Sequence, residues 1–195
     1  MSHYFKNDVN VKHQDIVIKE RINDIDFVFH SDNGVFSKSE LDYGSLALLN
    51  VLFKESIDGA LLDVGCGIGL LGVVLKKKFA DVCVDMIDVN DRALELAKIN
   101  ARTNGVVVNV YSSDVYSDVI KKYDIIITNP PIRAGKQVVL DILVNSRKYL
   151  NDDGCLYFVM RKSHGAPSTI KRLKEVFPHV DILDRDKGFY VICAK

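Results

Sequence analysis

Apolar and polar residues alternate in two short runs near the start of the chain, within DIVIKERINDIDFVFHSD at residues 15–32. A period of two is typical of strands with one buried face, so the runs on either side of RINDID predict a β-hairpin. The next segment, SLALLNVLF at residues 45–53, instead has the spacing of a helix, with Ser45 as a candidate N-cap. We therefore expect a hairpin and a helix before the main part of the fold.

From residue 59 onward, short apolar runs alternate with longer segments of helical spacing. Strands are predicted at residues 60–64, 82–88, 106–111, 123–128 and 155–160, and helices at 70–79, 90–105, 138–150 and about 167–177. VDILD and GFYVICA, joined through RDKG, predict an antiparallel pair at the end of the chain. This order predicts an α/β fold: a doubly wound, Rossmann-like, seven-stranded mixed sheet with an antiparallel C-terminal strand, preceded by the N-terminal β-hairpin.

Length and composition fit one globular domain. The chain has 195 residues, 48% of them apolar, which is enough to build a core. We expect a flexible tail at residues 1–12 and a single domain at 13–195, with the hairpin as an extension at 13–33 and a core at 34–195. The first residues lack the apolar segment of a signal peptide, and no run reaches the roughly 18 apolar residues of a membrane span. We therefore expect a cytoplasmic protein with no membrane partner.

Charge and cysteine usage narrow the range of partners. The formal net charge is zero, which argues against a strongly basic nucleic-acid binder and leaves room for a local basic patch. The four cysteines, Cys66, Cys83, Cys155 and Cys193, lie far apart and form no Cys-x-x-Cys pair. Buried free thiols in a reducing cytosol are favoured over a disulfide or a metal site, so we expect no metal. The sequence leaves the oligomeric state open.

Polar residues and glycines follow the predicted strands. The first strand is followed by a glycine loop at residues 65–69, the second ends at Asp88, and Asp114 and Asn129 follow the next two. In doubly wound sheets, ligands bind beyond the carboxyl ends of the strands, where the strand order switches. The sequence therefore predicts a site at this edge. For Asp114, within SSDVYS, the capping of a short helix is a close alternative to ligand binding.

The glycine loop, LLDVGCGIGLLG at residues 61–72, admits two cofactors. Residues 67–72 match Gly-x-Gly-x-x-Gly, and Asp88 lies about 20 residues further on, as in nicotinamide-binding proteins. However, the glycines begin at Gly65, and Asp63 lies in the strand before them. A carboxylate at this position would repel a pyrophosphate but suits a ligand with an ammonium group and a sulfonium, such as S-adenosylmethionine. Asp88 can accept hydrogen bonds from ribose hydroxyls and fits both cofactors.

The sequence YDIIITNPPI at residues 123–132 places an amide and two prolines after a strand that is apolar on both faces. A nucleobase amine is a poor nucleophile because its lone pair is delocalised, and two hydrogen-bond acceptors favour the tetrahedral shape that it must adopt. The side-chain oxygen of Asn129 and the main-chain carbonyl of Pro130 can supply these acceptors, and the prolines hold them rigidly. The alternative is that the Asn-Pro-Pro sequence only ends the strand and turns the chain.

Together these motifs resemble class I S-adenosylmethionine-dependent methyltransferases that act on amino groups. The resemblance depends on LLDVGCGIG, DVN, SSDV and TNPP. The more specific stretch NGVFSKSELDYGS, at residues 33–45, is similar to the catalytic domain of bacterial guanine-N2 methyltransferases of small-subunit ribosomal RNA. The similarity runs from about residue 34 to the end of the chain. It implies a methyltransferase domain whose partner is ribosomal RNA or the small ribosomal subunit.

The resemblance implies a role for each matching residue. The methionine end of S-adenosylmethionine is expected at Asp63, Gly65, Cys66, Gly67 and Gly69, the ribose at Asp88 beside Val89, and the adenine at Asp114 and Val115. Asn129 and Pro130 are the expected catalytic residues, and Asn129 also borders the cofactor. Phe36, Pro131, Ile132, Arg133 and Arg161 are the expected substrate contacts. For Phe36, a core position that joins the hairpin to the sheet is a close alternative.

Two departures from the family pattern concern the RNA. Longer members carry an extra N-terminal domain that this sequence lacks, so RNA positioning is expected to come from other residues, or the target to differ. The residue after the prolines is often aromatic in amino-methylating enzymes, but here it is Ile132, and the guanidinium of Arg133 could stack on the base instead. We expect Arg161 and Lys162 to contact phosphates, and the lysines at 76–78 to form a solvated face.

Several functions compete on the sequence alone. The leading interpretation is methylation of the N2 amine of a guanine in small-subunit ribosomal RNA. Asn-Pro-Pro would also serve another planar nitrogen, such as adenine N6 or a glutamine side chain. A nicotinamide-dependent oxidoreductase has no use for this motif, and a non-catalytic RNA-binding factor would not need every polar motif residue.

Overall fold

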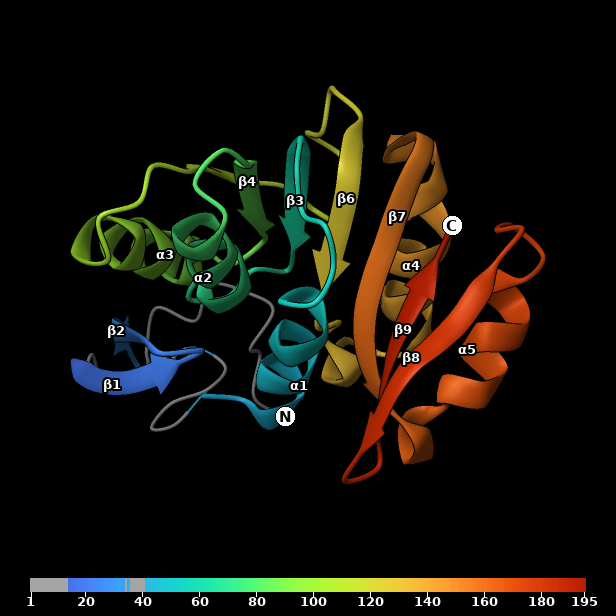
Figure 1. Ribbon diagram of the computed structural model, residues 1–195, viewed down its shortest axis with the longest axis horizontal. Coiled ribbons are helices and arrows are strands. Elements are labelled where there is room, and N and C mark those ends of the chain that lie inside the picture. Colours follow the sequence, from blue (N-terminus) through green and yellow to red (C-terminus); the bar gives the residue numbers. More distant parts are fainter. Residues whose placement is uncertain (1–13, 34, 36–40) are drawn as a thin grey trace.

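The computed structural model describes residues 14–33, 35 and 41–195. The strands and helices are arranged around one sheet, with a small hairpin beside it (Figure 1). The expected tail at residues 1–12 and the expected substrate contact Phe36 lie outside the described residues.

The sheet has seven strands in the order β5-β4-β3-β6-β7-β9-β8, which confirms the predicted fold class. Its strands are β3 (Ala60–Val64), β4 (Cys83–Asp88), β5 (Asn109–Ser112), β6 (Tyr123–Thr128), β7 (Leu150–Arg161), β8 (Val180–Asp186) and β9 (Phe189–Ala194). The first five strands in this order pair in parallel, and β9 runs antiparallel to both of its neighbours. The order reverses between β3 and β6, which is where such folds bind their ligands.

Helices cover both faces of the sheet and give it two hydrophobic clusters. One face packs against α1 (Tyr43–Leu52), α2 (Leu70–Lys78) and α3 (Asp91–Thr103), and the other packs against α4 (Lys136–Tyr149) and α5 (Ala166–Leu173). Because both faces are covered, the central strands carry apolar side chains on both faces: on β6, Ile125 and Ile127 belong to the first cluster and Ile126 to the second. Two short 3₁₀ turns, η1 (Ile132–Ala134) and η2 (Lys162–His164), follow β6 and β7.

Several predicted boundaries were wrong. Strand β5 begins at Asn109 rather than at residue 106, and α5 ends at Leu173, four residues before Phe177. Strand β7 begins at Leu150 rather than at residue 155, because the pairing of β6 with β7 is irregular over residues 151–154 and accommodates these extra residues. Helix α1 is capped by Asp42, whose carboxylate accepts a hydrogen bond from the backbone N–H of Ser45, so Ser45 is not the cap.

The N-terminal hairpin consists of β1 (Ile16–Ile22) and β2 (Ile25–Ser31), as predicted. Its turn residues, Asn23 and Asp24, both have positive φ angles, as a tight turn that matches the twist of the strands requires.

Two asparagines, Asn100 of α3 and its C-cap residue Asn104, attach the hairpin to the main domain. The Asn104 side chain binds both the N–H and the C=O of Val28, and Asn100 binds those of His30 in the same way. The two asparagines lie four residues apart on one face of α3, so their amides replace a neighbouring strand along the edge of β2. Asn100 also donates to the carbonyl of Ile68 in the glycine loop, 2.9 Å away. The hairpin and the glycine loop therefore share one buried side chain.

Two expectations about charged and sulfur-bearing residues change. The lysines that end α2 were expected to be solvated, but Lys76 donates to two carbonyls of the loop that follows it, and Lys77 donates to the carbonyl of Asp26 in the hairpin. All four cysteines are free thiols, but only Cys66 is buried, and Cys83 is exposed. Within the described residues, no helix is both long enough and apolar enough to cross a membrane.

Candidate active site

The carboxyl ends of β3, β4, β5, β6 and β7 border one pocket of about 860 Å³, a size typical of small-molecule sites. The hydroxyl of Thr128, at the end of β6, donates to the carbonyl of Val64 on β3, which fixes the two central strand ends against each other. Of the described residues that the sequence singled out, these line the pocket: Asp63, Gly65, Cys66, Gly67, Asp88, Val89, Asp114, Val115, Asn129, Pro130, Pro131, Ile132, Arg133 and Arg161. Residues that were predicted from their positions after the strands therefore line a single pocket.

The glycine loop connects β3 to α2 with two glycines on the pocket wall. Gly67 has a φ of +55°, and a Cβ atom there would meet nothing within 4 Å, so the backbone borders open space in the pocket. Its N–H donates to the Asp88 carboxylate at 2.9 Å. Gly69 differs from its predicted role, since it does not line the pocket. It is the N-cap residue of α2, and a Cβ atom there would lie 3.2 Å from the side chain of Ala97 on α3.

Asp63 is a buried acid at the base of the pocket, with 1% of its surface exposed. Its Oδ2 accepts a hydrogen bond from the N–H of Gly72 at 3.0 Å, whereas its buried Oδ1 has no hydrogen-bond partner among the described residues. Burial raises the pKa of the Asp63 carboxyl to about 7, and the hydrogen bond from Gly72 opposes this change. A buried carboxylate oxygen without a donor is costly, so this position is suited to a ligand that brings a positively charged donor.

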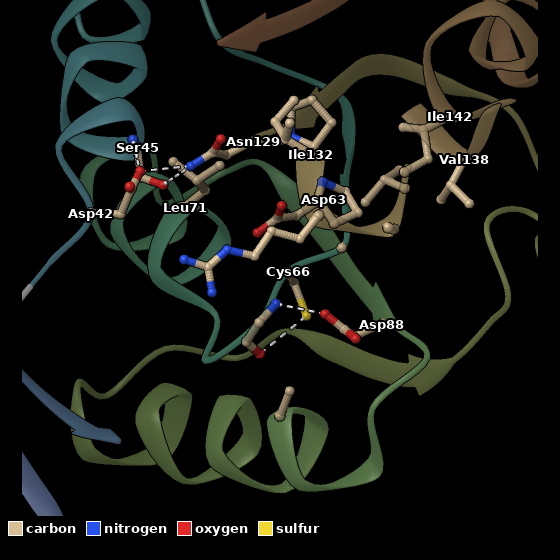
Figure 2. Close-up of a pocket in the computed structure, with 18 of the residues that line it drawn as sticks. Asp42, Ser45, Asp63, Cys66, Leu71, Asp88, Asn129, Ile132, Val138 and Ile142 are labelled. Atoms are coloured by element: carbon tan, nitrogen blue, oxygen red, sulfur yellow. Dashed lines mark hydrogen bonds between the residues drawn. The ribbon is translucent and has the colours of Figure 1, made fainter. Parts of the chain in front are cut away.

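Asp88 is held by the backbone at the end of β4. Its two oxygens accept hydrogen bonds from the N–H groups of Gly67 and Asn90, both at 2.9 Å. Burial raises the pKa of Asp88, and these backbone hydrogen bonds oppose the change. Each carboxylate oxygen can accept a further hydrogen bond, so Asp88 is placed to bind hydroxyl groups without changing its orientation. Figure 2 shows Asp63 and Asp88 on opposite sides of Cys66.

The turn at Asp114 and Val115, where the adenine is predicted to bind, has a strained backbone. Val115 has a φ of +54°, which is unfavourable for a β-branched residue. The hydroxyl of Ser113 donates to the carbonyl of Val115 and accepts from the N–H of Asp118, and these bonds hold the strained turn. Asp114 is exposed at the rim and Val115 is half-buried. Backbone strain of this kind often accompanies a ligand site, which supports the predicted role of this turn.

The amide of Asn129 is held in one orientation by the first turn of α1. Its Nδ2 donates to Asp42 Oδ2 at 2.7 Å and to Ser45 Oγ at 3.0 Å (Figure 2). An ionised carboxylate can only accept hydrogen bonds, so the NH₂ group must face Asp42 and the carbonyl oxygen must lie on the other side of the amide. The sequence therefore predicted an acceptor whose orientation depends on two residues that it did not identify as functional.

The segment after Asn129 turns away from the sheet within a few residues. Pro130 is buried, Pro131 precedes η1, and the N–H of Ala134 returns to the carbonyl of Pro131 at 2.9 Å. Ile132 is half-buried and belongs, with Val138, to the apolar side of the pocket, while Arg133 is exposed. The two prolines therefore fix a short, rigid exit from β6.

Several pocket residues were missed by the sequence reasoning. Two features of the sequence indicated Asp42 and Ser45. They are three residues apart, as an N-cap residue is from the backbone N–H that its side chain binds. Both also lie in LDYGS, a stretch that contributes to the family resemblance. Phe189 and His164 also line the pocket, and neither is part of a local motif. Phe189 reaches it through the pairing of β9 with β7, where it lies opposite Arg161.

The residues fit S-adenosylmethionine better than a dinucleotide. The buried Oδ1 of Asp63 suits an ammonium group and would repel a pyrophosphate, and the open space at Gly67 allows a ligand to approach the backbone closely. Asp63, Asp88 and the turn at Val115 lie at or just after the ends of three neighbouring strands, β3, β4 and β5, and this strand order is the one expected for the methionine end, the ribose and the adenine of the cofactor.

Comparisons with known proteins show the family to which the chain belongs. The family profile of the methyltransferase small domain matches residues 26–193. The chain is 43% identical over 196 residues to the uncharacterised protein YbxB of Bacillus subtilis and covers 98% of its length. It is 34% identical to the ribosomal RNA small subunit methyltransferase C of Haemophilus influenzae over 87% of this chain and 52% of that protein.

A solved structure shares the fold. The T. thermophilus 16S rRNA N2 G1207 methyltransferase, in complex with AdoMet and guanosine, superposes with a TM-score of 0.83 and 24% sequence identity, over 92% of this chain and 50% of that one. The chain thus spans about half the length of the ribosomal RNA methyltransferases that it matches, and almost the whole of the uncharacterised relative.

Proposed function

The chain belongs to the methyltransferase small domain family, and from this premise we propose that it transfers a methyl group from S-adenosylmethionine to the exocyclic N2 amine of a guanine in small-subunit ribosomal RNA. We propose residues 13–195 as one methyltransferase domain that acts in the cytoplasm on free RNA or on the small subunit. The observation that carries the proposal is the fixed amide of Asn129, whose NH₂ group is held by Asp42 and Ser45 on the rim of the pocket that contains Asp63.

The cofactor would lie along the strand ends. We assign its ammonium group to the buried Oδ1 of Asp63, its ribose hydroxyls to Asp88, and its adenine to the strained turn of Asp114 and Val115. Gly65, Cys66, Gly67 and Val89 line the same wall and would contact it through backbone and apolar atoms. When bound, S-adenosylmethionine supplies an electrophilic methyl group on a sulfonium, so no strong general base is required from the protein.

The protein contributes orientation at the amine. Asn129 Oδ1 and the Pro130 carbonyl would each accept one hydrogen of the N2 amine, which favours a tetrahedral nitrogen with its lone pair directed at the methyl carbon. The nitrogen forms its bond to that carbon as the carbon–sulfur bond breaks, and the amine then loses its proton to water. Asn129 remains neutral at every pH of interest and needs no activation.

The guanine-N2 assignment rests on two supports. Relatives at 34% identity are named ribosomal RNA small subunit methyltransferases, and a structure of this fold holds guanosine. Another planar amine, such as adenine N6 or a glutamine side chain, is the second candidate, because the same two acceptors would serve it. A nicotinamide-dependent oxidoreductase is disfavoured by the buried carboxylate of Asp63, and a non-catalytic RNA-binding factor would not need Asn129 to be fixed.

Two measurements test the function in sequence. Calorimetric titration with S-adenosylhomocysteine and with NAD should give binding of the first alone. A tritiated-methyl assay should then label naked ribosomal RNA or assembled small subunits but not DNA, and digestion to nucleosides should place the label on N2-methylguanosine. Label on N6-methyladenosine or on protein would replace the guanine assignment with the second candidate.

A further inference from the structure

A cross-strand row of one cation, one aromatic ring and one carboxylate crosses β7, β9 and β8 beside the pocket. Phe189 on β9 lies opposite Arg161 on β7 and opposite Asp186 on β8, so the three residues share one cross-strand row. Side chains directly opposite each other in antiparallel pairs lie close together, and here the guanidinium carbon of Arg161 lies over the Phe189 ring, 4.4 Å from its centroid. Arg161 and Phe189 both line the pocket.

The first turn of α1 holds this row in place. The Tyr43 ring packs against Phe189 with centroids 5.7 Å apart, and the Tyr43 hydroxyl donates to Asp186. Gly44 leaves space for the same ring, because a Cβ atom there would lie 2.9 Å from Phe189 Cε1. The neighbouring residues Asp42 and Ser45 bind the amide of Asn129. One helical turn therefore positions both the Asn129 amide and the aromatic support of Arg161.

Arg161 and Asn129 lie at the ends of neighbouring strands and line the same pocket. Thr128, the residue before Asn129, pairs with Phe158, and Arg161 lies three residues after Phe158 on the same strand. A guanidinium is planar, and one packed on an aromatic ring still offers its other face, on which nucleobases stack. Ile132, which follows the two prolines in the pocket wall, is aliphatic and offers no flat face on which a base could stack.

We propose that the Arg161 guanidinium, supported by Phe189, is the surface on which the target base stacks beside Asn129. This inference rests on the proposed function and names the contact that positions its base. Arg161 is then a base-binding residue rather than a phosphate contact, and Lys162 is the nearer candidate for phosphate.

The test uses nucleosides, because they carry no phosphate. Binding of guanosine, adenosine and guanosine monophosphate to the protein saturated with S-adenosylhomocysteine is measured by NMR titration for wild type, Arg161→Lys and Phe189→Leu. Lysine keeps the charge and loses the plane, so Arg161→Lys should weaken guanosine binding about tenfold, in keeping with the usual contribution of one stacked base. Phe189→Leu should weaken it in the same direction, and the affinity for S-adenosylhomocysteine should not change.

A matched control exists on the opposite face of the β8–β9 strand pair. Arg185 lies over the Tyr190 ring at 5.3 Å, in the adjacent cross-strand pair, and neither residue lines the pocket. Arg185→Lys removes a similar cation–aromatic contact and should leave nucleoside binding unchanged.

The outcomes separate the inference from the proposed function. Wild-type guanosine affinity in Arg161→Lys overturns the stacking role, and so does a loss confined to guanosine monophosphate, which would indicate a phosphate contact. If adenosine binds in place of guanosine, the guanine assignment fails. The effect of Arg161→Lys on adenosine binding then decides whether Arg161 stacks on the base. If the wild type binds no nucleoside, both are overturned.

Discussion

The Asn129 amide donates to the carboxylate of Asp42 at 2.7 Å, across 87 residues of sequence. Asp42 accepts at the same time from the N–H of Ser45, so one carboxylate caps α1 and orients the amide after β6. The helix begins where it does because of Asp42, and the same residue directs the NH₂ group of Asn129 towards the first turn of α1. Helix capping and orientation of the proposed catalytic amide are therefore one feature of the fold.

Asp42→Ser should separate these two roles. Serine is a good N-cap, so the melting temperature should change little, whereas the charged acceptor for Asn129 is lost. A misplaced catalytic group can lower rates by two orders of magnitude, and we expect kcat to fall roughly ten- to a hundredfold with unchanged affinity for S-adenosylhomocysteine. Ser45→Ala, which removes the second and longer hydrogen bond, should lower kcat only about threefold. Equal activity of wild type and Asp42→Ser would show that Asn129 is oriented by other contacts.

The raised pKa of Asp63 predicts a pH dependence of opposite sign for stability and for binding. Burial moves this pKa from 3.8 to about 7 in the folded protein, so the folded state holds the proton more tightly than the unfolded state between these values. Without cofactor, the Asp63 contribution to stability is therefore present at low pH and is lost as the pH rises towards 7. Thermal unfolding across this range should show the loss in wild type but not in Asp63→Asn.

Cofactor binding should change in the other direction, because an ammonium group pairs with the ionised carboxylate. If only ionised Asp63 binds, affinity for S-adenosylhomocysteine should rise roughly eightfold from about pH 6 to about pH 7.5, with release of a proton on binding. Calorimetry in buffers of different ionisation enthalpy measures that proton. Binding without proton release in this range would show that Asp63 does not receive the ammonium group.

Asn100 and Asn104 should differ in their effect on the cofactor. Asn100→Ala and Asn104→Ala each remove the side chain that pairs with one residue of β2, and each should lower the free energy of unfolding by about 2–4 kcal/mol. Only Asn100 also binds Ile68 in the glycine loop, so only Asn100→Ala should weaken S-adenosylhomocysteine binding. Chemical denaturation and calorimetry measure the two effects. Equal cofactor affinity in both variants would mean that the hairpin and the loop are not coupled through Asn100.

Val115→Gly should separate strain from binding. Its positive φ costs on the order of 1–3 kcal/mol in a valine, and glycine removes that cost, so the variant should be no less stable than wild type. It also removes apolar contact on the proposed adenine side, and affinity for S-adenosylhomocysteine should fall roughly five- to tenfold. Val107→Gly, at an 86% exposed position without positive φ, is the control and should leave cofactor affinity unchanged. A wild-type cofactor affinity in Val115→Gly would place the adenine elsewhere.

Local patterns predicted most of the fold and most of the residues at the strand ends that line the pocket. Alternation and helical spacing predicted the hairpin, the order of elements and the mixed sheet, because each of these follows from a short segment. Because Asp63, Asp88 and Asn129 lie at or just after the ends of parallel strands, the sequence alone predicted that they share one edge of the sheet, and all three line the pocket. The predicted ends of strands and helices were wrong where the local pattern and the tertiary packing disagree. Residues 106–108, for example, are apolar, yet β5 begins only at Asn109.

The proposed substrate side was harder to predict, because it is assembled from segments that lie far apart in the sequence. Phe189 reaches Arg161 only through the register of β9 with β7, and Asp42 reaches Asn129 only through the packing of α1. Gly69 shows the converse case: it lies within a binding motif, yet its space is required by Ala97 of a neighbouring helix. A motif identifies the segment that forms a site, whereas the contacts of each residue depend on the whole fold.

The central claim is that the Asn129 carbonyl oxygen accepts a hydrogen from the amine that is methylated. Single-turnover methyl transfer to small-subunit ribosomal RNA, measured with saturating S-adenosylmethionine for wild type and Asn129→Ala, tests it most directly. We predict that Asn129→Ala binds S-adenosylhomocysteine as wild type does and transfers the methyl group slower by about two to three orders of magnitude, the usual effect of removing one such polar contact to a transition state. A variant that binds the cofactor normally and transfers methyl within about threefold of the wild-type rate would contradict the account.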